Sequence, residues 1–248
     1  MIPKDRILEK LDSLFQGNDT AGAKRLLLYW LSEAEAAGDK GGKLLMLNEL
    51  MGLCRKQGER DNAIKFAEEA LFLVALMGIE ENIGAATTYL NSATVYKAFG
   101  DPENALRLYE RARVIYERDL PEGDERLGGL YNNMGLALVD LGRFAEADEL
   151  YKRAISVMEG LCDKEPEAAI TYLNMADAAK AEFSLSAAKD KIASLLENAK
   201  ALMEKGKDRT DGNYAFVCEK CASVFGYYGD EDYANELTAR SRRIYEGA

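Results

Sequence analysis

Tyr89-Leu-Asn91-Ser-Ala93 is the stretch that decides the fold, because it returns as Tyr131-Asn-Asn133-Met-Gly135 and again as Tyr172-Leu-Asn174-Met-Ala176. The second copy follows the first by 42 residues, and the third follows the second by 41. Self-similarity at a period of about 20 to 50 residues is typical of stacked repeats, because one repeat cannot bury its apolar face alone. The sequence therefore predicts a solenoid of helical repeats.

A second phrase follows the first and marks a turn inside each repeat. Gly142-Arg-Phe-Ala-Glu-Ala147 lies 42 residues after Gly100-Asp-Pro-Glu-Asn-Ala105, which lies 42 residues after Gly58-Glu-Arg-Asp-Asn-Ala63. Glycine ends a helix well because it adopts the left-handed conformation without a Cβ clash. We therefore predict about six antiparallel hairpins, each with a helix A, a turn and a helix B. They are expected at residues 4–39, 41–78, 83–119, 126–161, 167–205 and 213–247, with turns near Gly17, Gly58, Gly100, Gly142, Ser184 and Gly229.

The composition favours an ordered helical protein without the usual catalytic residues. Of the 248 residues, 48% are hydrophobic and 30% are charged, and the four prolines interrupt no long periodic segment. The chain has no histidine, which is the commonest general base and metal ligand. We therefore expect a non-enzymatic protein with no metal and no cofactor.

The charge and the hydropathy exclude several kinds of partner. Most of the net charge of −11 falls between residues 61 and 180, where 12 Lys and Arg stand against 22 Asp and Glu. An acidic surface repels phosphate groups, so we expect neither nucleic acid nor an anionic membrane as a partner. Residues 1–6 are charged where a signal peptide is apolar, and the longest apolar run, Leu71–Ile79, is too short to cross a bilayer. A cytoplasmic location is expected.

The segment from about Ala85 to Ala188 resembles tetratricopeptide repeats. The family has a small residue in helix A, a turn glycine, and alanine, an aromatic residue and alanine in helix B, which correspond here to Gly135, Gly142, Ala147, Tyr151 and Ala154. The long period and the phrase Leu150-Tyr-Lys-Arg-Ala154 are similar to the kinesin-light-chain type. The resemblance implies one all-α domain over residues 1–248, a right-handed superhelical α-solenoid. It also implies an adaptor that binds a peptide or protein along the concave surface formed by the A helices.

Polar side chains of the third to fifth hairpins line the groove that this resemblance implies. Asparagine is a poor residue for a helix interior, yet Asn91, Asn133 and Asn174 occupy the same place in three successive phrases. An amide offers both a donor and an acceptor, so a ladder of amides can hold the backbone of an extended peptide. The predicted peptide-binding residues are Asn91, Asn132, Asn133, Asn174, Thr87, Thr94, Lys97, Asp177 and Lys180.

The asparagine ladder also has a structural interpretation. Each amide can bond its neighbours and so fix the stacking of the A helices, and recurrence alone does not distinguish the two roles. A clamp for a C-terminal carboxylate, which some family members have, is not expected. Lys97 and Lys180 are the only cations at the predicted groove positions, and Asp140 and Asp177 flank them.

Two features near the C-terminal end also lead to predictions. Cys218 and Cys221 form a lone Cys-x-x-Cys pair that no histidine can complete, so we expect both to be buried helix residues rather than metal ligands. The last helix is expected to turn its charged residues outward, Arg240 among them, because a terminal repeat needs a polar outer face.

Two N-terminal segments are apolar on every face, Leu26–Leu31 and Leu71–Met77. A helix of this kind is buried on more than one side. Burial between neighbouring hairpins is one explanation. The alternative is a structural scaffold that forms a homodimer through an N-terminal convex face, and the predicted contact residues are Phe72, Leu76, Leu27 and Leu31.

Overall fold

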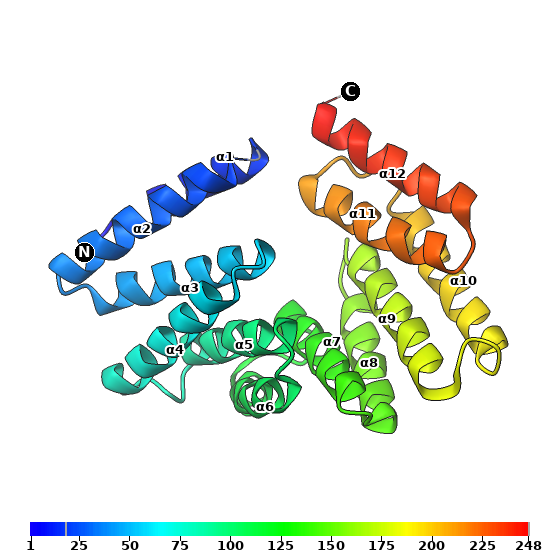
Figure 1. Cartoon of the computed structure of the whole chain (residues 1–248), viewed down its shortest axis with the longest axis horizontal. Coiled ribbons are helices and arrows are strands. Elements are labelled where there is room, and N and C mark those ends of the chain that lie inside the picture. Colours follow the sequence, from blue (N-terminus) through cyan, green and yellow to red (C-terminus); the bar gives the residue numbers. More distant parts are fainter. Residues whose placement is uncertain (18, 248) are drawn as a thin grey trace. The chain divides into compact units, whose positions relative to one another are not determined.

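The computed structural model describes residues 1–17 and 19–247 (Figure 1). Over these residues the chain forms twelve α-helices and no strand, which confirms the all-α class. The helices are α1 (Lys4–Gln16), α2 (Thr20–Ala36), α3 (Lys40–Lys56), α4 (Arg60–Met77), α5 (Ile83–Ala98), α6 (Pro102–Asp119), α7 (Glu125–Asp140), α8 (Phe144–Glu159), α9 (Glu165–Phe183), α10 (Lys189–Lys205), α11 (Gly212–Tyr227) and α12 (Glu231–Glu246).

Each odd-numbered helix contacts the even-numbered helix that follows it, from α1 with α2 to α11 with α12. We refer to the odd-numbered helices as A and to the even-numbered helices as B. Two compact units divide the chain: the first unit is Met1–Asp119 and the second unit is Leu120–Ala248. Each unit contains three hairpins. No helix in the described part of the chain combines the length and the apolar character that a membrane span needs.

Glycine forms most of the predicted turns. The left-handed φ angles are 73°, 82°, 71° and 94° at Gly58, Gly100, Gly142 and Gly229. Ser184 takes this place after α9 with a φ of 71°, a conformation that is strained for a residue with a Cβ. The prediction was wrong for the conformation of Gly17, which ends α1 with a φ of −79°, so this turn does not need the freedom of glycine.

Small residues let the two helices of a hairpin approach closely. Ala105 and Ala147 have no exposed surface, and Tyr151 fills the space beside helix A. A Cβ at Gly135 would lie only 2.5 Å from Cε1 of Tyr151, so the tyrosine packs directly on the backbone of α7. The small residue in helix A and the aromatic residue in helix B are therefore two halves of one contact.

Two tyrosines of the repeated phrase are covered by arginines from helix B. The guanidinium carbon of Arg111 lies 4.1 Å from the ring centroid of Tyr89, and that of Arg153 lies 4.1 Å from the ring centroid of Tyr131. Each guanidinium also donates a hydrogen bond to the phenol oxygen, at 2.7 Å and 2.6 Å respectively. A cation over an aromatic ring contributes about 0.5–1 kcal/mol at a partly exposed site. Both pairs therefore tie helix A to helix B.

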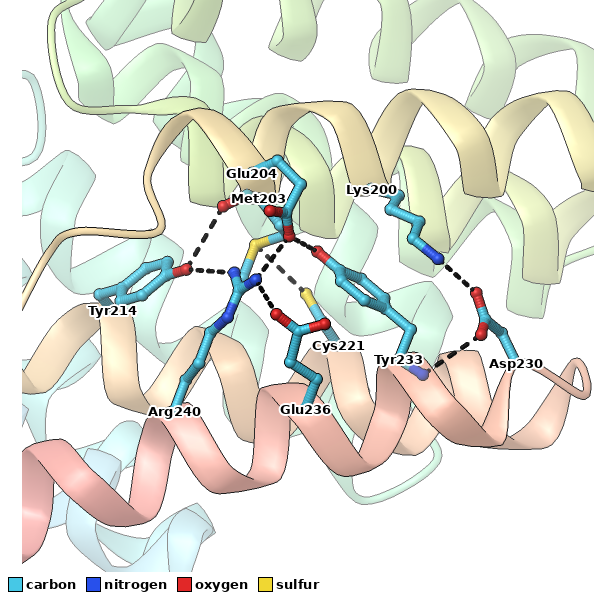
Figure 2. Close-up of polar contacts among 9 residues, drawn as sticks. All are labelled: Lys200, Met203, Glu204, Tyr214, Cys221, Asp230, Tyr233, Glu236 and Arg240. Atoms are coloured by element: carbon cyan, nitrogen blue, oxygen red, sulfur yellow. Dashed lines mark hydrogen bonds and ion pairs between the residues drawn. The ribbon is translucent and has the colours of Figure 1, made fainter.

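The last hairpin is joined to α10 by a buried polar cluster around Arg240 (Figure 2). Nη2 of Arg240 donates to Oε1 of Glu204 at 2.7 Å and also to Glu236. Nη1 donates to the hydroxyl of Tyr214 at 3.2 Å, and Tyr233 donates to the same Glu204 oxygen at 2.8 Å. Burial opposes the charge of Arg240, but these hydrogen bonds outweigh it and raise the pKa of the guanidinium.

The prediction that Arg240 points outward was therefore wrong, because its side chain is only 7% exposed. The neighbouring Arg242 and Arg243 are exposed, as expected for a terminal helix. Arg240 lies on the face of α12 that packs toward α10 and α11, where its partners were spread over three helices and were not visible in the local pattern. The predicted burial of Cys218 and Cys221 is confirmed, since neither has exposed surface.

Candidate functional site

The candidate site is the face of the A helices that carries the predicted polar residues. Within the first unit α3 contacts α5, and within the second unit α9 contacts both α7 and α11. Side chains at corresponding positions of neighbouring A helices therefore come together inside each unit.

In the first unit Asn91 bonds a residue that the sequence analysis missed. Nδ2 of Asn91 on α5 donates to Oδ1 of Asn48 on α3 at 2.9 Å. Nδ2 of Asn48 in turn donates to Oγ1 of Thr88 at 3.1 Å and to the carbonyl oxygen of Leu44 at 2.9 Å. Asn48 was missed because it lies outside the repeated Tyr-x-Asn phrase. The only sign of it in the sequence was an asparagine in the interior of a helix.

The same diagonal bond joins α7 and α9 in the second unit. Nδ2 of Asn174 donates to Oδ1 of Asn132 at 2.9 Å. The partner is thus Asn132, one residue before the position that the repeat register had suggested. Asn133 is half-buried and makes no side-chain hydrogen bond to any residue that the structure describes. Asn174 therefore joins α9 to α7.

Thr87 and Thr94 each contact a tyrosine of helix B. The hydroxyl oxygens of Thr87 and Tyr116 are 2.8 Å apart, and those of Thr94 and Tyr109 are 3.1 Å apart. Both threonines also donate to carbonyl oxygens one turn earlier in α5. These contacts give the two threonines a structural role inside the hairpin. The remaining predicted residue of α5, Lys97, is half-buried near the end of the helix.

Asp177 and Lys180 come together with two tyrosines that the sequence analysis missed. Tyr228 donates from its hydroxyl to Oδ1 of Asp177 at 2.7 Å. The ammonium of Lys180 lies 4.3 Å from the ring centroid of Tyr227, and the two tyrosine rings meet edge to face at 5.0 Å. Burial and the bond to Asp177 raise the pKa of Tyr228, so its phenol stays protonated as a donor. Tyr227 is 62% exposed, so this cluster has an open aromatic surface.

The two missed tyrosines immediately precede the turn glycine, Gly229. The sequence signal that could have revealed them was a pair of adjacent aromatic residues at the end of a predicted A helix. They belong to the sixth hairpin, where the repeat spacing changes, so the register did not align them with groove positions of the other hairpins.

A buried hydroxyl in the second unit lacks a partner. Tyr151 is 1% exposed, and among the described residues its phenol oxygen has no hydrogen-bond partner. In the first unit the equivalent residue, Tyr109, forms a hydrogen bond with Thr94. In the second unit the position of that threonine is occupied by Leu136, which has no hydroxyl to offer Tyr151. Burial raises the pKa of Tyr151, and the charges of Asp140 and Asp177 raise it further.

This difference predicts opposite effects for one substitution at two equivalent sites. Tyr151→Phe is expected to raise the free energy of unfolding by about 1 kcal/mol, because it removes a buried hydroxyl that gives up its hydrogen bonds to water on folding and gains none in the protein. Tyr109→Phe is expected to lower it by about 1 kcal/mol, because it removes a hydrogen bond. Urea unfolding followed by circular dichroism measures both. Equal losses in the two variants would show that the Tyr151 hydroxyl does find a partner.

The residues predicted for self-association divide into two groups. Phe72 is 68% exposed and Leu76 is 56% exposed, both on α4. Leu27 has no exposed surface and belongs to the core, so its assignment to a contact surface was wrong. One residue along a helix is a rotation of about 100°, and this rotation turns Leu27 inward while Leu28 is 42% exposed. Leu31 is half-buried.

Three further features were candidates for a site: a metal-binding group, a reactive thiol and a surface hollow. No group of three or more Cys, Asp or Glu residues that could hold a metal ion occurs within residues 1–17 and 19–247. Burial raises the pKa of Cys221 to about 12, so its thiol is not a nucleophile at neutral pH. A shallow hollow lies between the loops that precede α7 and α9, lined in part by Asp124 and Cys162. Its two cations are already paired, Lys164 with Glu125 at 2.5 Å and Arg126 with Asp124 at 2.7 Å.

Comparison with known proteins identifies the repeats. A family model described as "Tetratricopeptide repeat" matches residues 43–118, and a second model with the same description matches residues 128–165. "Protein KINESIN LIGHT CHAIN-RELATED 2" from Arabidopsis thaliana is 27% identical over 198 residues, which cover 78% of this chain. The chain spans only 29% of the length of that relative.

Solved structures share the fold at low sequence identity. BtubC (BKLC) from P. vanneervenii superposes with a TM-score of 0.61 and 20% identity, over 92% of this chain and 91% of that chain. NprR in complex with its cognate peptide NprX superposes with a TM-score of 0.62 and 16% identity, over 95% of this chain and 65% of that chain. The repeated phrases, the hairpins and these similarities agree: residues 43–118 and 128–165 match tetratricopeptide repeats, and the chain is similar to proteins of the kinesin-light-chain type.

Proposed function

We propose that this protein is a non-enzymatic peptide- or protein-binding module whose contact surface is the A-helix face of the second unit. One observation carries the proposal. Three consecutive A helices, α7, α9 and α11, are tied together by side chains yet leave the amide of Asn133 and the ring of Tyr227 available. A protein of the same fold, NprR, has been solved with its cognate peptide. That complex supports a peptide as the class of ligand, because α9 contacts both α7 and α11 in this chain.

The chemistry of this face suits an extended peptide. The free amide of Asn133 offers a donor and an acceptor to a peptide backbone. The exposed ring of Tyr227 offers a peptide an apolar contact, and the ammonium of Lys180 over that ring offers a positive charge at the same place. Asn174 and Asn132 hold α7 and α9 at a constant spacing, so their role is to position the surface. The module would act as an adaptor in the cytoplasm.

The test selects ligands without assuming their identity. Random peptides displayed on phage are selected against the wild-type chain, and the binders are measured against Asn133→Ala, Tyr227→Ala and a control, Glu149→Ala. The control residue lies on α8 with its side chain 77% exposed. Binders are expected to lose about fivefold in affinity for each of the first two variants, because one hydrogen bond or partly buried contact contributes about 1 kcal/mol. They are expected to keep full affinity for the control.

Two results would contradict the proposal. Selection that yields no specific binder would argue against a peptide groove in this protein. Binders that tolerate both Asn133→Ala and Tyr227→Ala would place the contact surface elsewhere. Melting temperatures of the variants, compared with the wild type, separate lost binding from lost folding.

A further inference from the structure

The outer face of α4 carries an apolar stripe that none of residues 1–17 and 19–247 covers. Phe72, at 68%, is more exposed than any other large apolar side chain in the described residues except Met1. Leu76, one helical turn later, is 56% exposed, and the small Ala75 beside it is exposed too. Lys65 lies seven residues before Phe72, which places it on the same stripe because seven residues make about two turns.

The stripe is not required by packing inside the repeat. The positions that correspond to Phe72 at the repeat distance of 42 residues are Val114 and Ser156, and both are also exposed. A serine in this place in α8 shows that a hairpin folds without an apolar residue there. Burying one large apolar side chain stabilises a protein by about 1.5–3 kcal/mol, so an exposed phenylalanine is available to an interface.

We infer that α4 pairs with the α4 of a second copy of the chain, in an antiparallel and symmetric contact centred near Phe72 and Ala75. In a two-fold pair the same patch of each copy meets its counterpart, so each exposed apolar side chain is buried once in each copy. The antiparallel register sets the large Phe72 of one copy against the small Ala75 of the other. This fit of a large residue against a small one allows two helices to approach closely.

Charges at the two ends of the stripe complement one another in this register. Lys65 lies on α4 about two turns before the centre of the stripe, and Glu80 lies in the loop that follows the end of α4 at Met77. Neither residue has an ion-pair partner among residues 1–17 and 19–247. In the antiparallel pair Lys65 of each copy faces the loop after α4 of the other copy, residues 78–82, which carries Glu80. Lys65 then lies between that carboxylate and Glu68 of its own helix, and the contact gains two symmetric ion pairs.

Other occupants fit this face less well. An anionic membrane would meet a protein with a net charge of −11, and Glu68 stands on the stripe itself. An unrelated helical partner would need its own cation and anion in the same reversed order, whereas a second copy supplies them by symmetry.

The inference is tested by the mass in solution. Sedimentation equilibrium between about one and about one hundred micromolar, a range in which weak dimers dissociate, is expected to show wild-type mass rising toward twice the 27.4 kDa of one chain. The double variant Phe72→Ser with Leu76→Gln is expected to stay at one chain and to keep its helical circular dichroism. Val114→Ser is the matched control, because it removes an exposed apolar side chain from the corresponding position of α6 and is expected to leave the association unchanged.

A charge reversal tests the register itself. Lys65→Glu is expected to raise the dissociation constant of the dimer about tenfold, because two ion pairs become repulsive contacts. Lys65→Glu combined with Glu80→Lys is expected to restore it. A wild-type mass of one chain at every concentration would overturn the inference, and so would a dimer that survives the Phe72 and Leu76 changes. Failure of the charge reversal to be rescued would overturn the antiparallel register.

Discussion

Arg240→Ala is expected to lower the free energy of unfolding by about 3 kcal/mol, because it removes the cation from a buried cluster and leaves its partners unpaired. Glu204 would lose its charge-assisted bond, and the buried hydroxyl of Tyr214 would lose one of its contacts. We take the lower end of the usual range of about 3–5 kcal/mol because the side chains of Glu204 and Glu236 are 41% and 53% exposed and water can reach them.

The loss is expected to be local, and the measurement can show it. Hydrogen exchange should accelerate first in α11 and α12, because the cluster joins these helices to α10 and repeats depend mainly on their neighbours. Arg242→Ala is the matched control, since Arg242 is exposed on the same helix and its loss is expected to cost less than about 0.5 kcal/mol. Equal destabilisation by the two variants would show that the cluster contributes nothing beyond surface charge.

Gly135→Ala and Gly129→Ala are expected to change stability in opposite directions, although both glycines lie in α7. At Gly135 the new methyl group would meet Cε1 of Tyr151 at 2.5 Å, and overpacking of this kind costs about 1–3 kcal/mol. At Gly129 a Cβ meets no atom within 4 Å, so alanine gains helix propensity of about 0.5–1 kcal/mol.

Urea unfolding of the two single variants measures the difference directly. Because the propensity gain is the same at both sites, the gap between the variants reports the contact with Tyr151 alone. Gly135→Ala in a Tyr151→Leu background is expected to lose most of its penalty, since the ring that blocks the methyl group is gone. A penalty of the same size in that background would mean that the backbone, not the ring, excludes the methyl group.

The hairpins could be predicted because their signals are local. Gly58, Gly100 and Gly142 mark turns through their own backbone conformation, and the buried alanines mark helix crossings through their own lack of side chain. Such signals depend on sterics within a few residues, and the repeat shows each of them more than once. Gly17 is the instructive exception, because the break after α1 was visible in the sequence but its backbone conformation was not.

The candidate site could be predicted only in part. The repeat suggested that Asn91, Asn133 and Asn174 share one place, yet the observed bonds are diagonal, from Asn91 to Asn48 and from Asn174 to Asn132. Which amide meets which depends on the offset between neighbouring helices along their axes. A shift of one residue moves a side chain by about 1.5 Å along the helix axis and about 100° around it. Aligning the repeats by their sequence phrases does not reveal this shift.

By itself, the sequence determined the helical class, the length of the repeat, the positions of most turns and the resemblance to tetratricopeptide repeats, because all of these follow from patterns between chain neighbours or between copies. Tertiary structure alone decided which side of each helix is covered. It buried Arg240 and Leu27, left Phe72 exposed, and brought Tyr227 and Tyr228 to Lys180 and Asp177. The physical reason is that burial is a property of a helix face and its neighbours: a charged residue is stable inside when partners from other helices meet it, and an apolar residue stays outside when none do.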